Sequence, residues 1–137
     1  MVEGKLLLEA SGLMAEQLVS SSGNCPPFAM IVSNDSENPT PITPDLLDAK
    51  GLDPHDREAY FKYIQEFVPV DDIEGLSVVV SARIKRTLDG PEEPAIIVHV
   101  EMKGAPSTLF IRPYTYEDGK YDGLEPFFQD TEPRIIG

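Results

Sequence analysis

The side chains that could bind a ligand lie mainly in the stretch from Leu76 to Pro113. Three runs in it, LSVVVSARIKRT, PAIIVHVEMK and STLFIRP, are rich in β-branched and aromatic residues and predict three consecutive antiparallel strands. Polar residues alternate with apolar ones along each run, and alternation places them together on one face, which we expect to be the outer, solvated face of the sheet. The candidate ligand-binding residues on that face are Arg83, His99, Glu101, Arg112 and Tyr114.

A solvated sheet face with cations, an imidazole and a phenol is suited to an anionic small molecule or an acidic peptide. The same residues have a second interpretation, which is ordinary cross-strand ion pairing, where each pair contributes only ~0.2 to 1 kcal/mol. A ligand site requires these side chains to converge in a concave pocket. The sequence favours ion pairing and leaves both interpretations open.

Two further residues could take part in catalysis or metal binding. His55 lies between Asp53 and Asp56, but aspartates at this position are also the expected caps of a following helix. Cys25 precedes two prolines and an apolar run, which is typical of a buried structural thiol. Zinc-ligand spacings, nucleophile elbows and phosphate-binding glycine loops are all absent from the sequence. We therefore predict no catalytic residue, no metal and no cofactor, and an enzyme is the less favoured class.

The elements that would position these residues can be predicted from periodicity and turn signals. We expect a helix over residues 4–21, a strand over 27–33, a turn over 34–38, an edge strand over 40–43, a helical turn over 43–49 and a helix over 54–67. The predicted buried face of the first helix comprises Leu6, Leu7, Ala10, Leu13, Met14 and Leu18. That of the 54–67 helix comprises Ala59, Tyr60, Tyr63, Ile64 and Phe67.

Two signals concern the C-terminal part of the chain. Asp118 and Gly119 between tyrosine-rich flanks predict a hairpin that folds back over residues 120–124. The tail keeps Ile135 and Ile136, so we expect it to dock on the body while Arg134 pairs with a surface acid.

These elements predict an α+β fold. It would have a single antiparallel sheet of about five strands with two helices packed on one face. The order of helix, short hairpin, helix and C-terminal meander is like that of profilin-like and roadblock-type domains, and such an analogy transfers no activity.

Length and composition limit the class of protein. A chain of 137 residues fits a single domain over 1–137, and apolar residues at 41% are typical of a globular protein. We find no apolar run long enough to span a membrane and no signal peptide. One cysteine cannot form an internal disulfide, which favours a reducing, cytoplasmic location. The net charge of −13 opposes binding to nucleic acid or to an anionic membrane.

Three segments together resemble a group of short bacterial proteins of unassigned activity. They are PPFAMIV, TLFIRPY and the ending GLEPFFQDTEPRIIG. Those proteins likewise combine an early Pro-Phe strand with a late Glu-Pro-Phe and a terminal Pro-Arg-Ile, which here is Pro133, Arg134 and Ile135. The resemblance implies a bacterial, cytosolic setting and transfers no catalytic residue.

The acidic residues are unevenly distributed, and this suggests a function. Residues 34–75 carry 11 acids and 3 bases, whereas residues 76–113 carry 4 acids and 5 bases. An acidic surface steers basic partners, so the leading hypothesis is a non-catalytic protein-interaction module for a basic protein, of immunity-protein or secretion-chaperone type. The alternative is small-ligand binding or hydrolysis on the sheet face around Arg83, His99 and Arg112. Homodimerisation through a sheet edge is a third hypothesis.

Overall fold

The computed structural model describes residues 4–34, 39–85, 87–132 and 134–136. Within these residues the helices are α1 (Gly4–Ser22), α2 (Pro44–Asp48) and α3 (Arg57–Phe67), with a 3-10 turn at Val70–Asp72. The strands are β1 (Phe28–Ser33), β2 (Thr40–Ile42), β3 (Ile73–Ile84), β4 (Glu93–Met102), β5 (Ser107–Glu117), β6 (Lys120–Gly123) and β7 (Phe127–Thr131). The predicted α+β class with one antiparallel sheet is confirmed, while the predicted two helices are only roughly right, since the described residues also form the short helix α2. Most of the predicted turn over 34–38 lies outside the described residues.

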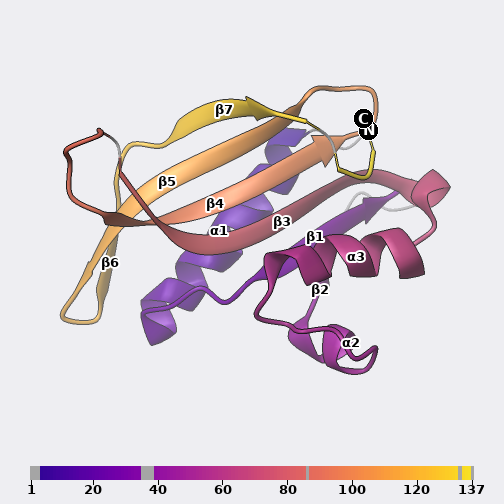
Figure 1. Ribbon diagram of the computed structural model, residues 1–137, viewed down its shortest axis with the longest axis horizontal. Coiled ribbons are helices and arrows are strands. Elements are labelled where there is room, and N and C mark those ends of the chain that lie inside the picture. The colour runs from indigo at the N-terminus through magenta and orange to yellow at the C-terminus, as the bar shows by residue number, and fades with distance from the viewer. Residues whose placement is uncertain (1–3, 35–38, 86, 133, 137) are drawn as a thin grey trace.

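Within the described residues, seven strands form one antiparallel sheet, in the order β2-β1-β3-β4-β5 (Figure 1). The outer edge of β5 is shared, because residues 107–111 pair with β7 and residues 114–117 pair with β6. The β5–β6 turn is the predicted hairpin, with Asp118 at φ 52° and Gly119 at φ 74°. The prediction of about five strands missed β7, whose FFQDT sequence has no regular alternation.

The helices cover opposite faces of the sheet, which corrects the prediction that both pack on one face (Figure 1). Phe28, Met30 and Val32 of β1 pack in one core cluster with α1. The intervening Ala29 packs in a second cluster with Leu47 of α2 and with the buried side of α3. The unbroken apolar run FAMIV is typical of a strand that is buried on both faces. We refer below to the α1 face and the α3 face.

The buried side of α1 differs from the predicted one. Leu7, Ser11, Ala15 and Val19 are fully buried, whereas Leu13 is 58% exposed. Ser11 can occupy the interface because its Oγ lies 2.6 Å from the Oγ of Ser77 on β3, so each hydroxyl has a partner. The predicted Ala10, Met14 and Leu18 are half-buried at the edge of the interface, and the side chain of Leu6 lies outside the described residues.

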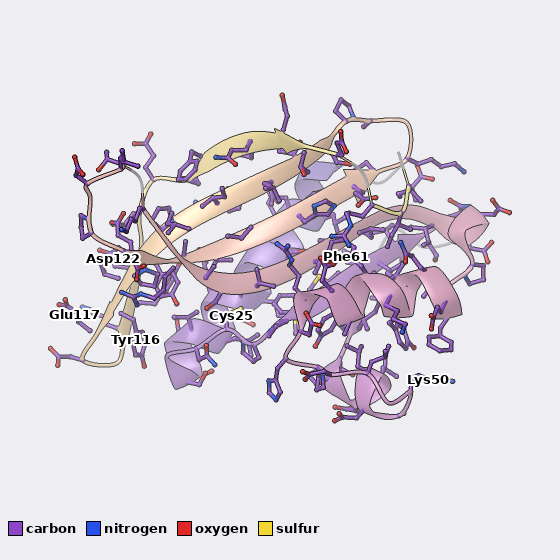
Figure 2. The ribbon with its side chains drawn as sticks, in the orientation of Figure 1. Cys25, Lys50, Phe61, Tyr116, Glu117 and Asp122 are labelled. Carbon is purple, nitrogen blue, oxygen red and sulfur yellow. The ribbon has the colours of Figure 1, made fainter. Side chains whose placement is uncertain are left out.

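The third helix begins at Arg57 and not at residue 54. The carboxylate of Asp56 accepts from the N–H of Glu58 at 3.0 Å and caps the helix, while Asp53 accepts from the N–H of His55 at 2.9 Å. Both aspartates therefore serve the local backbone, as the capping interpretation predicts. Ala59, Tyr60 and Ile64 are buried as expected, but so is Phe61, whereas Phe67 is 44% exposed. Phe61 lies between α3 and the sheet (Figure 2).

Gly23 directly follows α1 and has little free space around its Cα. Its φ of +77° is in the left-handed region, and a Cβ built there would lie 2.9 Å from Cε2 of Tyr116. Tyr116 belongs to β5 near its hairpin with β6 (Figure 2). Gly51 after α2 has a similar φ of +73°, with nothing within 4 Å of such a Cβ. Both glycines therefore have a positive φ, but only at Gly23 would an added Cβ meet another side chain.

We predict that Gly23→Ala lowers the free energy of unfolding by about 1 kcal/mol or more beyond the loss caused by Gly51→Ala, because overpacking adds to the backbone strain. Urea denaturation of both variants measures the difference. In a Tyr116→Ala background the ring is gone, and the two substitutions should then cost about the same. An excess cost of Gly23→Ala that persists in that background would contradict the steric explanation.

Candidate functional site

The five predicted ligand residues do not share one surface. The register pairs Val78 with His99 and Leu76 with Glu101, which places His99 and Glu101 on the α3 face. Ile96 pairs with Arg112, which lies on the α1 face, and Tyr114 is buried in the α1-side cluster. Arg83 is exposed towards the end of β3 and pairs with Glu92 at 3.4 Å.

The expectation that these residues line one solvated face is therefore wrong. If all the polar residues shared one face, Leu76 and Val78 would lie on the same face as Ile96 and Val98, whereas the register places the two pairs on opposite faces. Alternation within one strand does not fix how neighbouring strands align, and a one-residue slip exchanges the two faces. The sheet also has a helix on each face, so polar residues on either face of the strands can be covered by a helix.

On the α3 face, Glu101 is fully buried and holds the C-terminal tail. Its Oε2 accepts from the N–H of Arg134 at 2.7 Å, and its Oε1 accepts from the N–H groups of Ile135 and Ile136, each at 2.9 Å. The Nε2 of His99 lies 2.6 Å from Oε2. A carboxylate only accepts, so this nitrogen carries the proton and donates. The carboxylate thus has four donors.

These donors decide the protonation of Glu101. Burial alone would raise its pKa, but the hydrogen bonds from His99 and from the N–H groups of Arg134, Ile136 and Ile135 outweigh burial and hold the pKa below the ordinary value of 4.5. The group is therefore ionised at neutral pH. Because its lone pairs are occupied by the tail and by His99, the geometry suits a structural anchor better than a general base.

The side chain of Arg134 fixes the tail from the outside. Its guanidinium makes two hydrogen bonds to the carboxylate of Glu58, at 2.6 and 3.2 Å, and lies 4.2 Å from the ring centroid of Phe61. The ion pair lowers the pKa of Glu58. Phe61 in turn meets the ring of His99 edge to face, with centroids 5.1 Å apart. The expectation that Arg134 pairs with a surface acid is confirmed, and Ile136 is buried as predicted.

On the α1 face, a groove runs between α1 and the sheet. Its volume is about 430 Å³, and it is lined by Leu8, Glu9, Gly12, Leu13, Glu16, Ile96, Phe110 and Arg112. We call it the α1 groove. Phe128 of β7 continues its floor, since its ring is stacked edge to face on Phe110 with centroids 5.2 Å apart and is 60% exposed. Sequence patterns missed this site, because Leu13 was assigned to the buried side of α1.

Arg112 is the one predicted ligand residue that lines the α1 groove. Its Nη1 donates to Glu16 at 3.0 Å, and the hydroxyl of Tyr121 also donates to this carboxylate, at 3.4 Å. Burial, followed by the negative charge of Glu16, raises the pKa of Tyr121 to about 12, so the phenol stays protonated. This cluster ties α1 to β5 and β6 and leaves the groove with apolar walls and a charged end.

The remaining candidates show no arrangement that supports chemistry. Burial raises the pKa of Cys25 to about 11, so it carries no thiolate at neutral pH. His55 is exposed, on the turn that precedes α3. Among the side chains that the structure describes, no three His, Cys, Asp or Glu residues are grouped to hold a metal ion. No described helix is both long enough and apolar enough to cross a membrane.

Comparison with known proteins gives this chain no family. No protein-family model, no curated protein and no solved structure matches it. The bacterial setting implied by the short sequence motifs therefore stays a prediction, and Pro133 of the Pro-Arg-Ile motif lies outside the described residues.

We predict that Glu101→Gln lowers the free energy of unfolding at pH 7 by about 3 kcal/mol, because buried donors lose a charged acceptor and an amide N–H faces them instead. The folded pKa of Glu101 is lowered, so its contribution is complete above pH 4.5 and is lost as the pH falls towards the folded pKa. Urea denaturation of the wild type and the variant between pH 7 and pH 3 should show the difference shrinking below pH 4.5.

Glu92→Gln is the matched control, because this acid belongs to an exposed ion pair with Arg83. Its effect at pH 7 should stay within about 1 kcal/mol. If Glu101→Gln were as mild as Glu92→Gln, or if its effect were the same at pH 3 as at pH 7, Glu101 would not be the ionised anchor of the tail.

Proposed function

We propose that the protein is a non-catalytic interaction module that binds a basic, amphipathic segment of a partner protein in the α1 groove. The observation that carries the proposal is an apolar groove with exposed Leu13 and Phe128 and with carboxylates along its sides, in a chain of net charge −13. A module of this kind would be of immunity-protein or secretion-chaperone type.

The apolar part of the groove supports binding of aliphatic side chains. A volume of about 430 Å³ is within the usual range of binding pockets. Leu13 in the lining is 58% exposed, and Phe128, which contacts the lining residue Phe110, is 60% exposed; large exposed apolar side chains on one face mark interaction surfaces. Gly12 has nothing within 4 Å of a built Cβ, so packing within the molecule does not require a glycine in the middle of α1. The missing side chain lets a partner approach the helix closely.

The charges around the groove determine the kind of partner. Glu9 and Glu16 line it from α1, and Asp130 lies two residues beyond Phe128 on the same face of β7. Arg112, the base in the lining, is already paired with Glu16. A segment with aliphatic residues on one side and Lys or Arg on the other would match the groove in both respects. The acid-rich segment 34–75 adds long-range attraction for the same partner.

We predict that Leu13→Lys weakens binding of a basic amphipathic helical peptide at least tenfold, because the substitution removes apolar contact and adds a like charge to the groove. Leu88→Lys is the matched control, since Leu88 is 94% exposed in the turn between β3 and β4. Fluorescence anisotropy with a labelled Leu/Lys peptide and a Leu/Glu counterpart measures both. We expect the basic peptide alone to bind, less tightly at high salt. Equal binding by both lysine variants would rule out the groove.

A second copy of this chain is the competing occupant. β2 forms one edge of the sheet and β6 and β7 share the other, and dimerisation through one of these edges stays a prediction. Sedimentation equilibrium of the wild type and of Leu13→Lys separates the cases. A dimer lost in the variant would place a second copy in the groove, against the proposal, while a dimer kept in both would point to a sheet edge.

Small-ligand binding is the second candidate, and Arg112 is the observation that favours it. Of the predicted trio Arg83, His99 and Arg112, only Arg112 lines the groove, and its Nε is buried without a partner among the described residues. A ligand with an apolar body and a carboxylate could compete with Glu16 for the guanidinium. Thermal shift measurements with medium-chain fatty acids would show stabilisation of the wild type that Arg112→Gln abolishes.

A further inference from the structure

The C-terminal tail contacts the rest of the protein as a bound peptide would. The β7 strand ends at Thr131, and the N–H groups of Arg134, Ile135 and Ile136 bond to the side chain of Glu101 and not to a neighbouring strand. The tail is therefore held by side chains of α3 and β4 that form a site of their own. We call this the tail site.

Each part of the tail site recognises a separate feature of the tail. Glu101 accepts three successive backbone N–H groups, and Gln65 donates to the carbonyl of Arg134 at 3.2 Å. The carboxylate of Glu58 and the ring of Phe61 hold the guanidinium. Ile136 is buried in the cluster of α2, α3 and the sheet, and Ile135 packs at its edge. Together these contacts select an arginine followed by two aliphatic residues.

We propose that the tail site is a peptide-binding site whose resident ligand is the chain's own tail, and that a partner segment with an arginine followed by two aliphatic residues can replace it. The site lies on the α3 face, so it is separate from the α1 groove and does not depend on the function proposed there. Binding by exchange would make access to the site depend on release of the tail.

Two features of the contacts favour exchange over simple opening. All three N–H groups bond to one carboxylate, and the Arg134–Glu58 pair is about half exposed, so the tail can leave as one unit. Once it leaves, Glu101 loses three of its four hydrogen-bond donors, which is costly for a carboxylate placed beside the apolar side chains of α3 and the sheet. An incoming segment that supplies the same three N–H groups and a cation removes that cost, whereas solvent in an apolar surrounding does so poorly.

The resident tail sets how tightly an added peptide appears to bind. A tethered ligand competes at an effective concentration on the order of millimolar, so binding to the wild type should be weak. The apparent affinity scales with the fraction of molecules whose site is open. Weakening the tail without changing the site should therefore strengthen binding of the added peptide. This inverse relation distinguishes a replaceable ligand from a fixed structural element.

Arg134→Ala in the 137-residue chain is the variant that tests this relation. We predict that it binds a labelled, C-terminally amidated TEPRIIG peptide about tenfold more tightly than the wild type, because the tail loses an exposed bidentate ion pair and a cation–π contact while the peptide retains both. Fluorescence anisotropy measures the affinity. Hydrogen exchange of the amides of residues 134–136 should be faster in the variant than in the wild type.

Glu58→Ala added to Arg134→Ala is the matched control, because it removes the arginine acceptor from the site itself. It should reverse the gain, and a TEPAIIG peptide should bind weakly to both variants with no dependence on Glu58. Both substituted side chains are about half exposed, so the fold should persist, which circular dichroism checks. Peptide binding to Arg134→Ala that is no tighter than to the wild type, or that is insensitive to Glu58, would overturn the proposal.

Discussion

The structure depends on one buried charge. Glu101 is fully enclosed and ionised, and a charge in that position is tolerated only with donors around it. Three of its four donors are backbone N–H groups of the tail, more than thirty residues further along the chain. The buried carboxylate on β4 therefore depends on the tail for most of its hydrogen bonds. His99 supplies the fourth donor and, through its contact with Phe61, links the same carboxylate to α3.

Both faces of the sheet are covered, and this explains why polar side chains occur inside it. Ser77 and Val78 are neighbours on β3, yet one meets Ser11 of α1 and the other packs beneath α3. Ser11, Ser77, His99 and Glu101 are stable there because each has a specific partner, in the Ser11–Ser77 pair and the His99–Glu101 pair, whereas the buried Oγ of Ser107 has none among the described residues. Such pairs also fix the position of the helices, since a shift of α1 along the sheet would separate the two hydroxyls.

Much of the fold could be predicted from local patterns, and most of the site could not. Apolar runs and turn residues such as Asp118 and Gly119 determine strands and the hairpin through nearby backbone preferences, which act within a few residues. Strand register is a property of pairs of strands, so local patterns could not predict on which face of the sheet His99 and Glu101 lie. The α1 groove likewise depends on the rotation of α1 about its own axis. The Ser11–Ser77 contact turns Ser11 towards the sheet, and this rotation leaves Leu13 exposed.

Overall charge and local shape have different roles in the proposed binding. The largest excess of acids is in residues 34–75, whereas the acids that line the α1 groove come from α1. Charge at a distance raises the rate of encounter with a basic partner and fades with salt, but it does not choose a docking position. Apolar burial is short-ranged and does choose one. In the proposed complex, Leu13 and Phe128 would thus set the docking position of the partner, and the acid-rich segment would set the rate of encounter.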